Sequence, residues 1–233
     1  NSNGKLEDCN CRNDPFGGLA ERVSLVREYR KRYPEALLLD SGGYLGLNNV
    51  DRKGPAAMRL MEMMDYRAWG VGDQELYRGL SGFLRLAGKH RERMISATIL
   101  DREGKWPFAE YRIFRVNSVR IGVIGLTAPE TFSFFPKENM DFSHEEPEKA
   151  LARLLPALRE KADYIVALSQ MGRKTDEAVA AKATGLGLII GGHSQTLLER
   201  EIQAGDCRIV QAGKGGGRVG EVILEFDGSN TLK

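Results

Sequence analysis

Short apolar runs alternate along this chain with longer segments of helical periodicity, and no other feature restricts its fold as much. The runs at 36–40, 94–100, 164–170 and 186–192 predict strands, the first of them continuous enough to be buried on both faces. The intervening segments carry apolar residues at helical spacing. Alternation of this kind is typical of an α/β chain with a mixed sheet or two stacked sheets.

The remaining stretches predict where helices, hairpins and loops lie. Helical spacing predicts five helices, over 18–33, 55–66, 73–89, 145–162 and 173–184. The stretch 111–127 predicts a hairpin around an Asn-Ser turn, and 200–227 predicts further antiparallel strands. We find no repeat or linker, so we expect a single domain over residues 1–233.

Composition excludes several functional classes. The 233 residues are 42% hydrophobic and 28% charged, which suits a globular domain with a substantial core. The formal net charge is only +2 and both signs are interspersed, so a nucleic-acid partner is not expected. No apolar run approaches the roughly 20 residues of a membrane span, so we predict no transmembrane segment.

Polar stretches follow several of the predicted strands. They are "LDSGGYLG", "GVGDQE", "LSQMG" and "GGHSQT", which begin at positions 39, 70, 168 and 191. In open α/β sheets, ligands bind beyond the carboxyl ends of the strands. These stretches are therefore the candidate site, and His193 is its one imidazole.

These stretches, in this order, resemble motifs of the calcineurin-like metallophosphoesterases and, within them, of the 5′-nucleotidase family. "GGLAERVSLVREYRKRYPEALLLDSGG", "GVGDQEL", "VRIGVIGLTAPET", "ADYIVALSQMG", "LGLIIGGHSQT" and "CRIVQAG" carry the resemblance over nearly the whole chain. It implies a four-layer αββα sandwich, in which two stacked mixed sheets are flanked by helices. It also implies two divalent metals at the strand ends that activate a water for attack on phosphorus.

Residue by residue, the sequence departs from the family pattern at the first three metal motifs. The opening Asp-x-His falls on Asn1 and Asn3, and the bridging aspartate falls on Gly43. The metal-binding asparagine of Gly-Asn-His-Glu falls on Asp73, which can still bind a metal. The histidine that follows it, which is catalytic in the family, falls on Gln74.

The departures continue at the later motifs. The aspartate that supports the catalytic histidine falls on Tyr77, and the histidine of Leu-Ser-His falls on Gln170. In Gly-His-x-His, the first histidine is kept as His193 and the second becomes Gln195. Neutral amides are poor ligands for zinc or manganese, so we do not expect a dinuclear Mn, Zn or Fe centre. Most of these substitutions are near-isosteric, so the shape of the pocket can persist without metals.

The two kept residues also have ordinary structural interpretations. Asp73 stands at the start of a predicted helix and could serve as its N-cap. His193 follows a strand and could be a hydrogen-bonded structural residue rather than a metal ligand.

The three cysteines leave three hypotheses open. Cys9 or Cys11 could form a structural disulfide, for example with Cys207; Cys9 and Cys11 could be a redox dithiol. Alternatively their thiolates, with Cys207, His193 or Asp73, could bind a single thiophilic ion such as Cu(I) or Zn²⁺. The chain has no C-x-x-C-H motif, so no covalent haem is expected.

We therefore expect a degenerate 5′-nucleotidase-like protein that is not a phosphatase and acts as a binding or assembly subunit, with another protein as its partner. The alternatives are a redox or thiophilic-metal protein and a phosphoesterase with atypical ligands. The resemblance implies an extracytoplasmic location. It also implies that the first family strand would precede Asn1 and that no C-terminal nucleotide-binding domain is included in residues 1–233.

Overall fold

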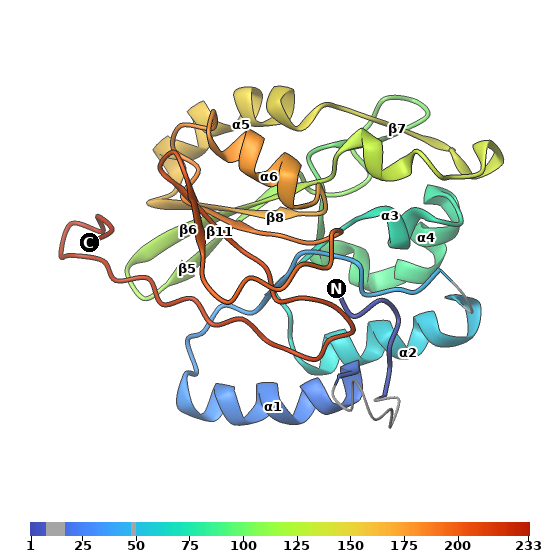
Figure 1. Ribbon diagram of the computed structural model, residues 1–233, viewed down its shortest axis with the longest axis horizontal. Coiled ribbons are helices and arrows are strands. Elements are labelled where there is room, and N and C mark those ends of the chain that lie inside the picture. Colours follow the sequence, from blue (N-terminus) through green and yellow to red (C-terminus); the bar gives the residue numbers. More distant parts are fainter. Residues whose placement is uncertain (8–16, 48–49) are drawn as a thin grey trace.

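The computed structural model describes residues 1–7, 17–47 and 50–233. Among these residues the strands form three sheets, of six, three and two strands. The six-stranded and three-stranded sheets lie face to face between helices, so the predicted αββα sandwich is confirmed (Figure 1).

The six-stranded sheet has the order β10–β11–β9–β8–β6–β5. Its strands are β5 Tyr111–Val116, β6 Val119–Leu126, β8 Tyr164–Ser169, β9 Leu188–Ile190, β10 Ile202–Ala204 and β11 Cys207–Val210. The four inner strands run parallel, and each edge strand is antiparallel to its neighbour. The sheet is therefore mixed, and the predicted 111–127 hairpin forms one of its edges.

The three-stranded sheet is parallel, in the order β1–β2–β3. Its strands are β1 Leu39–Asp40, β2 Ala68–Gly70 and β3 Met94–Ile95. The two-stranded sheet pairs β4 Ile99–Asp101 with β7 Phe142–His144 in antiparallel fashion.

The helices form the two outer layers. They are α1 Leu19–Arg32, α2 Val50–Met63, α3 Asp73–Leu76, α4 Leu80–Ala87, α5 Pro147–Lys161 and α6 Arg173–Ala180, with short 3₁₀ helices at Gly88–Arg93, Pro129–Phe132 and Lys137–Asn139. Figure 1 shows α1 and α2 on the side of the three-stranded sheet, with α5 and α6 on the far side of the larger sheet.

Three apolar clusters hold these layers together. One joins α1, α2 and α4 to the three-stranded sheet around Trp69 and Met61. A second joins α5 and α6 to the larger sheet around Leu158 and Ile189. The third fills the space between the two sheets, where Ile95 of β3 meets Val166 of β8. Burial of apolar surface on both faces of each large sheet explains why its strands are almost continuously hydrophobic.

Two predicted elements are divided in the structure. The helix predicted over 73–89 breaks after Leu76, and Gly79, whose φ of +81° is left-handed, is the N-cap of α4. Asp141 then accepts hydrogen bonds from the first backbone N–H groups of α4, at 3.0 Å from Ser81 N. The strand predicted over 94–100 splits into β3 and β4 because Ser96 Oγ accepts the N–H of Ile99 at 3.2 Å and turns the chain.

Other boundaries also differ from the prediction. The second helix starts at Val50 rather than at Pro55, which lies inside it. The predicted loop over 128–144 contains β7. The prediction of a strand over 217–227 is wrong: Phe226 forms an isolated bridge with Leu232, and the backbone groups of 218–224 form no backbone hydrogen bond with the described residues. An extended segment becomes a strand only when a neighbour exchanges such bonds with it.

None of the described helices has the length and apolarity needed to cross a membrane.

Candidate functional site

The candidate site lies where loops after parallel strands of both sheets meet. These are residues 41–46 after β1, 71–75 after β2, 170–172 after β8 and 191–196 after β9. Ser41 Oγ donates to the carbonyl of Gly191 at 3.3 Å and so joins the two sheets directly. The predicted motifs are therefore brought together, and residues 1–4 lie against them.

Asn1, Gln170 and the backbone of His193 form the first part of the site. The side-chain oxygen of Asn1 accepts hydrogen bonds from Gln170 Nε2 at 3.1 Å and from the His193 N–H at 3.3 Å. Gln170 is 1% exposed. Two amides thus join the positions that the resemblance assigns to a metal.

Asn3 and Gln74 form a second amide pair. Gln74 Nε2 donates to Asn3 Oδ1 at 3.1 Å. The position that would carry the catalytic histidine is therefore held by a neutral hydrogen bond to another substituted position. Tyr77, which replaces that histidine's supporting aspartate, packs its ring edge-on against Phe135 at 5.5 Å.

Gly43 lies against the Asn1 side chain, which would have to move to admit an aspartate here. Its φ of +67° is left-handed, and a Cβ at this position would overlap the side-chain oxygen of Asn1. The Asn1 amide therefore occupies space that an aspartate at position 43 would need. The absence of a metal-bridging aspartate at position 43 and the placement of the Asn1 side chain are therefore linked by packing.

Asp73 and His193 form the charged part of the site. Asp73 Oδ1 lies 3.4 Å from His193 Nδ1, with the two side chains 16% and 35% exposed. The nearby Asp73 carboxylate raises the pKa of His193, against the lowering effect of burial. Asp73 is not an N-cap, because Gly72 holds that position and Asp73 begins the helix.

Left-handed backbone conformations recur at positions of the candidate site. Asn3, His193 and Gln195 have φ values of 52°, 60° and 54°. Such conformations are uncommon for residues other than glycine and persist only where the surroundings enforce them. Gln195 is exposed, and its side chain forms no hydrogen bond with the described residues. The structure thus places it beside the site rather than in its amide network.

Glu75 holds the loop after β1 in place, and the sequence analysis did not identify it. Its carboxylate accepts backbone N–H groups of Gly43, Tyr44, Leu45 and Gly72 at 2.9 to 3.1 Å. Burial raises its pKa to about 7, although the backbone donors act in the opposite direction. A Glu three residues after the Gly72 N-cap is a capping-box signal that could have identified it.

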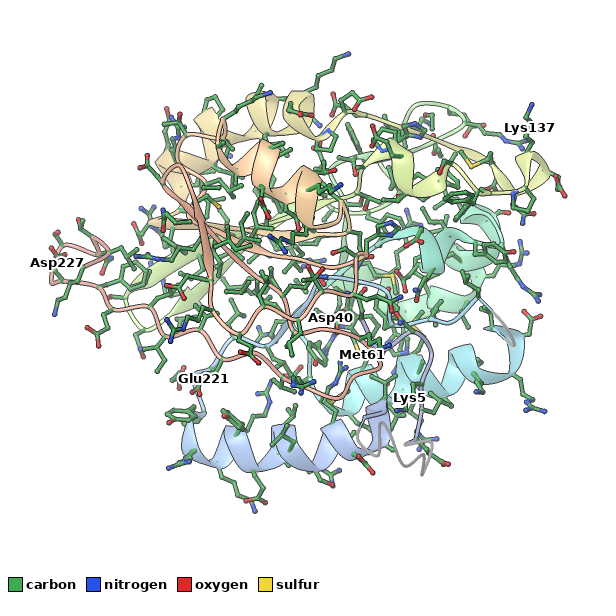
Figure 2. All side chains as sticks on the ribbon, in the orientation of Figure 1. Lys5, Asp40, Met61, Lys137, Glu221 and Asp227 are labelled. Carbon is green, nitrogen blue, oxygen red and sulfur yellow. The ribbon has the colours of Figure 1, made fainter. Side chains whose placement is uncertain are left out.

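A buried ion pair supports the same loop. Arg22 Nη1 lies 3.3 Å from Asp40 Oδ2, with both side chains almost fully buried. Asp40 also accepts the N–H of Gly42 at 2.9 Å and is buried. Figure 2 labels it near the middle of the view. The pair holds the chain as it leaves β1.

Asp176 is a second buried acid that sequence reasoning missed. Ser169 Oγ donates to its Oδ1, while its Oδ2 has no partner among the described residues. Burial raises its pKa to about 7. Its position in an amphipathic helix gave no sign that the carboxyl would face the core.

The donor set does not fit a dinuclear Mn, Zn or Fe centre. Eight positions correspond to the metal ligands and the catalytic histidine of the family, and six of them carry Asn, Gln or Gly. The eight are Asn1, Asn3, Gly43, Asp73, Gln74, Gln170, His193 and Gln195. The described residues contain no group of three His, Cys, Asp or Glu placed to bind a metal. The oxygens Gln170 Oε1 and Gln74 Oε1 are buried and receive no hydrogen bond from the described residues, and they are neutral ligands. Two divalent charges would face Asp73 and one imidazole only.

The cysteine hypotheses rest on residues outside the described part of the chain. Cys9 and Cys11 belong to residues 8–16, so their disulfide, redox and metal-binding roles stay predictions. Cys207 is a free thiol, 1% exposed in β11, and packs in the cluster beneath α5 and α6. Burial raises its pKa to about 12, which disfavours the thiolate that metal binding needs.

Comparison with known proteins points to one group. No protein-family model matches the chain. A snake venom 5′-nucleotidase of Crotalus adamanteus is 30% identical over 197 residues, which cover 79% of this chain and 33% of that protein. The 5′-nucleotidase of Homo sapiens is 29% identical over 246 residues, which cover 91% of this chain and 42% of that protein.

A solved structure gives the same result. The 5′-nucleotidase precursor of Thermus thermophilus superposes with a TM-score of 0.81 at 25% identity, over 100% of this chain and 50% of that one. The chain therefore spans a third to a half of the length of these three proteins.

Proposed function

Because this chain belongs to the calcineurin-like metallophosphoesterases and is homologous to the catalytic domain of 5′-nucleotidases, we propose that it is a pseudoenzyme of that family. In this proposal it does not hydrolyse phosphoesters and acts as a binding or assembly subunit. The observation that carries the proposal is the Asn1 side chain, which takes the space of the bridging carboxylate and hydrogen-bonds Gln170.

Charge supports the loss of catalysis. A phosphoryl transition state needs concentrated positive charge, which two metals supply in a dinuclear site. Here the corresponding positions carry neutral amides, and the one imidazole is paired with Asp73. Restoring one metal ligand would leave the other amides in place, and an aspartate at position 43 would still overlap the Asn1 side chain.

Retention of the scaffold supports a binding role. Glu75 fixes the loop that follows β1, and Asn3, His193 and Gln195 have left-handed conformations. These conformations cost on the order of 1 kcal/mol or more each. A chain that keeps a costly surface loop without its chemistry is best explained by recognition of a partner, and a second protein subunit is the partner we propose.

The test combines elemental analysis with a hydrolysis assay on the natively purified protein. We expect no stoichiometric manganese, zinc or iron, and no hydrolysis of p-nitrophenyl phosphate when these metals are added. About two equivalents of such a metal together with metal-dependent hydrolysis would overturn the proposal.

Blocking the thiols before elemental analysis separates the alternative role of Cys9 and Cys11. About one equivalent of copper or zinc that is lost on blocking would favour the thiophilic-metal function instead. Metal that is absent from both samples would leave the binding role.

The location of the protein is also a proposal. We infer an extracytoplasmic location, because one relative is a snake venom protein and a structural neighbour is described as a precursor. Protease accessibility in intact cells, with a cytoplasmic marker as control, would test it.

A further inference from the structure

A second pocket lies at the opposite end of the sheets from the candidate site. It is lined by residues that precede β1 and β2 and by the end of β5, whereas the candidate site follows β1 and β2. Its volume is about 210 Å³. The lining residues that matter here are Arg30, Glu35, Leu37, Arg67, Phe114 and Arg115.

Positive charge dominates this pocket. Three of its lining residues are arginines and one, Glu35, is an acid. Asp65 does not line the pocket, but its Oδ2 lies 3.4 Å from Arg30 Nη2. Arg115 helps to lower the pKa of Asp163, although Arg120 has the larger effect. Arg67 forms no ion pair within the described ranges, so its charge is uncompensated.

Arg30 also presents an unused donor. Its Nη2 donates to the Asp65 carbonyl at 3.0 Å, which fixes one side of the guanidinium. Its Nε is buried and has no acceptor in the part of the chain that the structure describes. A buried N–H without an acceptor costs free energy, but Nε is almost inaccessible, so an anion in the pocket would contact Arg30 through its terminal nitrogens.

Arg67 is held in place by an aromatic ring. Its guanidinium carbon lies 5.8 Å from the centroid of Phe114, close enough for a cation–π contact. This contact limits the conformations of an otherwise exposed side chain. A planar, pre-positioned guanidinium is suited to bidentate binding of a carboxylate or phosphate.

The size of the pocket limits its ligand. At roughly 30 Å³ per water molecule, 210 Å³ corresponds to about seven waters. Pockets for drug-sized ligands run from about 300 Å³ upward. The space therefore suits one oxyanion group, and a whole nucleotide would extend beyond it.

We propose that this pocket binds a small oxyanion, a carboxylate, phosphate or sulfate group, through Arg67 and Arg30. The group comes either from a free ion or from an acidic side chain of a bound peptide. The proposal does not depend on the pseudoenzyme assignment, because the pocket shares no residue with the candidate site.

The test is a titration with inorganic phosphate, sulfate and a hexaglutamate peptide in the presence of EDTA at low ionic strength. Arginine Nε–Hε NMR signals would report binding, and we expect saturable shifts for Arg67 and Arg30. Arg67→Gln should weaken binding about tenfold, because it removes a charged fork-shaped donor. Stronger binding of the ions identifies a free ion as the ligand, and stronger binding of the peptide identifies an acidic segment.

Arg32→Gln is the matched control. Arg32 is also exposed and lies 6.0 Å from the ring centroid of Tyr33, but it does not line the pocket. Its variant should bind as the wild type does. Absence of saturable shifts with all three probes, or equal loss of affinity in both variants, would overturn the proposal. Arg67→Lys keeps the charge without the fork, so it tests the same contact if Arg67→Gln does not fold.

Discussion

Asp73 Oδ1 and His193 Nδ1 lie 3.4 Å apart, and this pair joins the loop after β2 to the loop after β9. In a dinuclear phosphoesterase site, residues at these positions would be held by metals. Here the carboxylate and the imidazole hold each other, and the pKa of His193 is raised by the neighbouring carboxylate. When His193 is protonated, this ion pair therefore takes part of the structural role that the resemblance assigns to a metal ion.

Asp73→Asn should lower the pKa of His193. The raised pKa means that the pair stabilises the fold fully below the ordinary histidine pKa of about 6.5 and loses this contribution as pH rises through the folded value. The chain has three histidines, so an NMR titration of their imidazole signals can follow each one. In addition, the free energy of unfolding of the variant should lack the decrease that the wild type shows as pH rises through the His193 pKa.

Glu62→Gln is the control for this titration. Glu62 Oε2 lies 3.9 Å from His90 Nε2, so this variant should move the signal of His90 and leave His193 unchanged. An unchanged His193 pKa in Asp73→Asn would show that the pair does not form in solution.

Gly43→Asp should destabilise the protein rather than restore a metal site. The substitution meets two obstacles, a φ of +67° and overlap with the Asn1 side-chain oxygen. We expect a loss of about 2–4 kcal/mol in the free energy of unfolding, from backbone strain and overpacking together. Chemical denaturation would measure it.

Gly104→Asp separates the two causes. Gly104 has a φ of +73°, but a Cβ there would have no neighbour within 4 Å, so its variant carries the backbone cost alone. Equal losses in both variants would mean that Asn1 does not occupy the space beside position 43.

The ordered motifs allowed the layers and the convergence of Asp73 with His193 to be predicted from sequence. Strand-end stretches meet because parallel strands place their carboxyl ends at one edge. Sequence alone did not predict that Asn1 accepts from Gln170, because two amides at positions 1 and 170 carry no pattern that relates them. It also missed Asp176, since a carboxyl in a short helix looks solvated unless its burial is known, and it missed Glu75 because the capping-box spacing after Gly72 was not used.

Glu75→Gln should cost about 2–4 kcal/mol of stability. Four backbone N–H groups converge on the carboxylate, and an amide in its place offers one oxygen and adds a competing donor. Thermal and urea unfolding would measure the loss. Glu28→Gln breaks only the exposed pair with Lys31 and should change stability by less than about 0.5 kcal/mol. If Glu75→Gln left the stability unchanged, these backbone hydrogen bonds would not be what holds the loop.

Asp176→Asn should flatten the pH dependence of stability. Burial raises the pKa of this carboxyl from 3.8 to about 7, so its contribution is fully present below pH 3.8 and is lost as pH rises through about 7. The loss amounts to at most about 4 kcal/mol, and burial of the charged form is its physical cause. Urea unfolding from pH 4 to pH 8 should show the variant gaining stability relative to wild type as pH rises. Glu28→Gln, which breaks only the exposed pair with Lys31 in α1, should leave the slope unchanged. Parallel curves for wild type and Asp176→Asn would mean that the carboxyl is solvated and that its lone Oδ2 is satisfied by water.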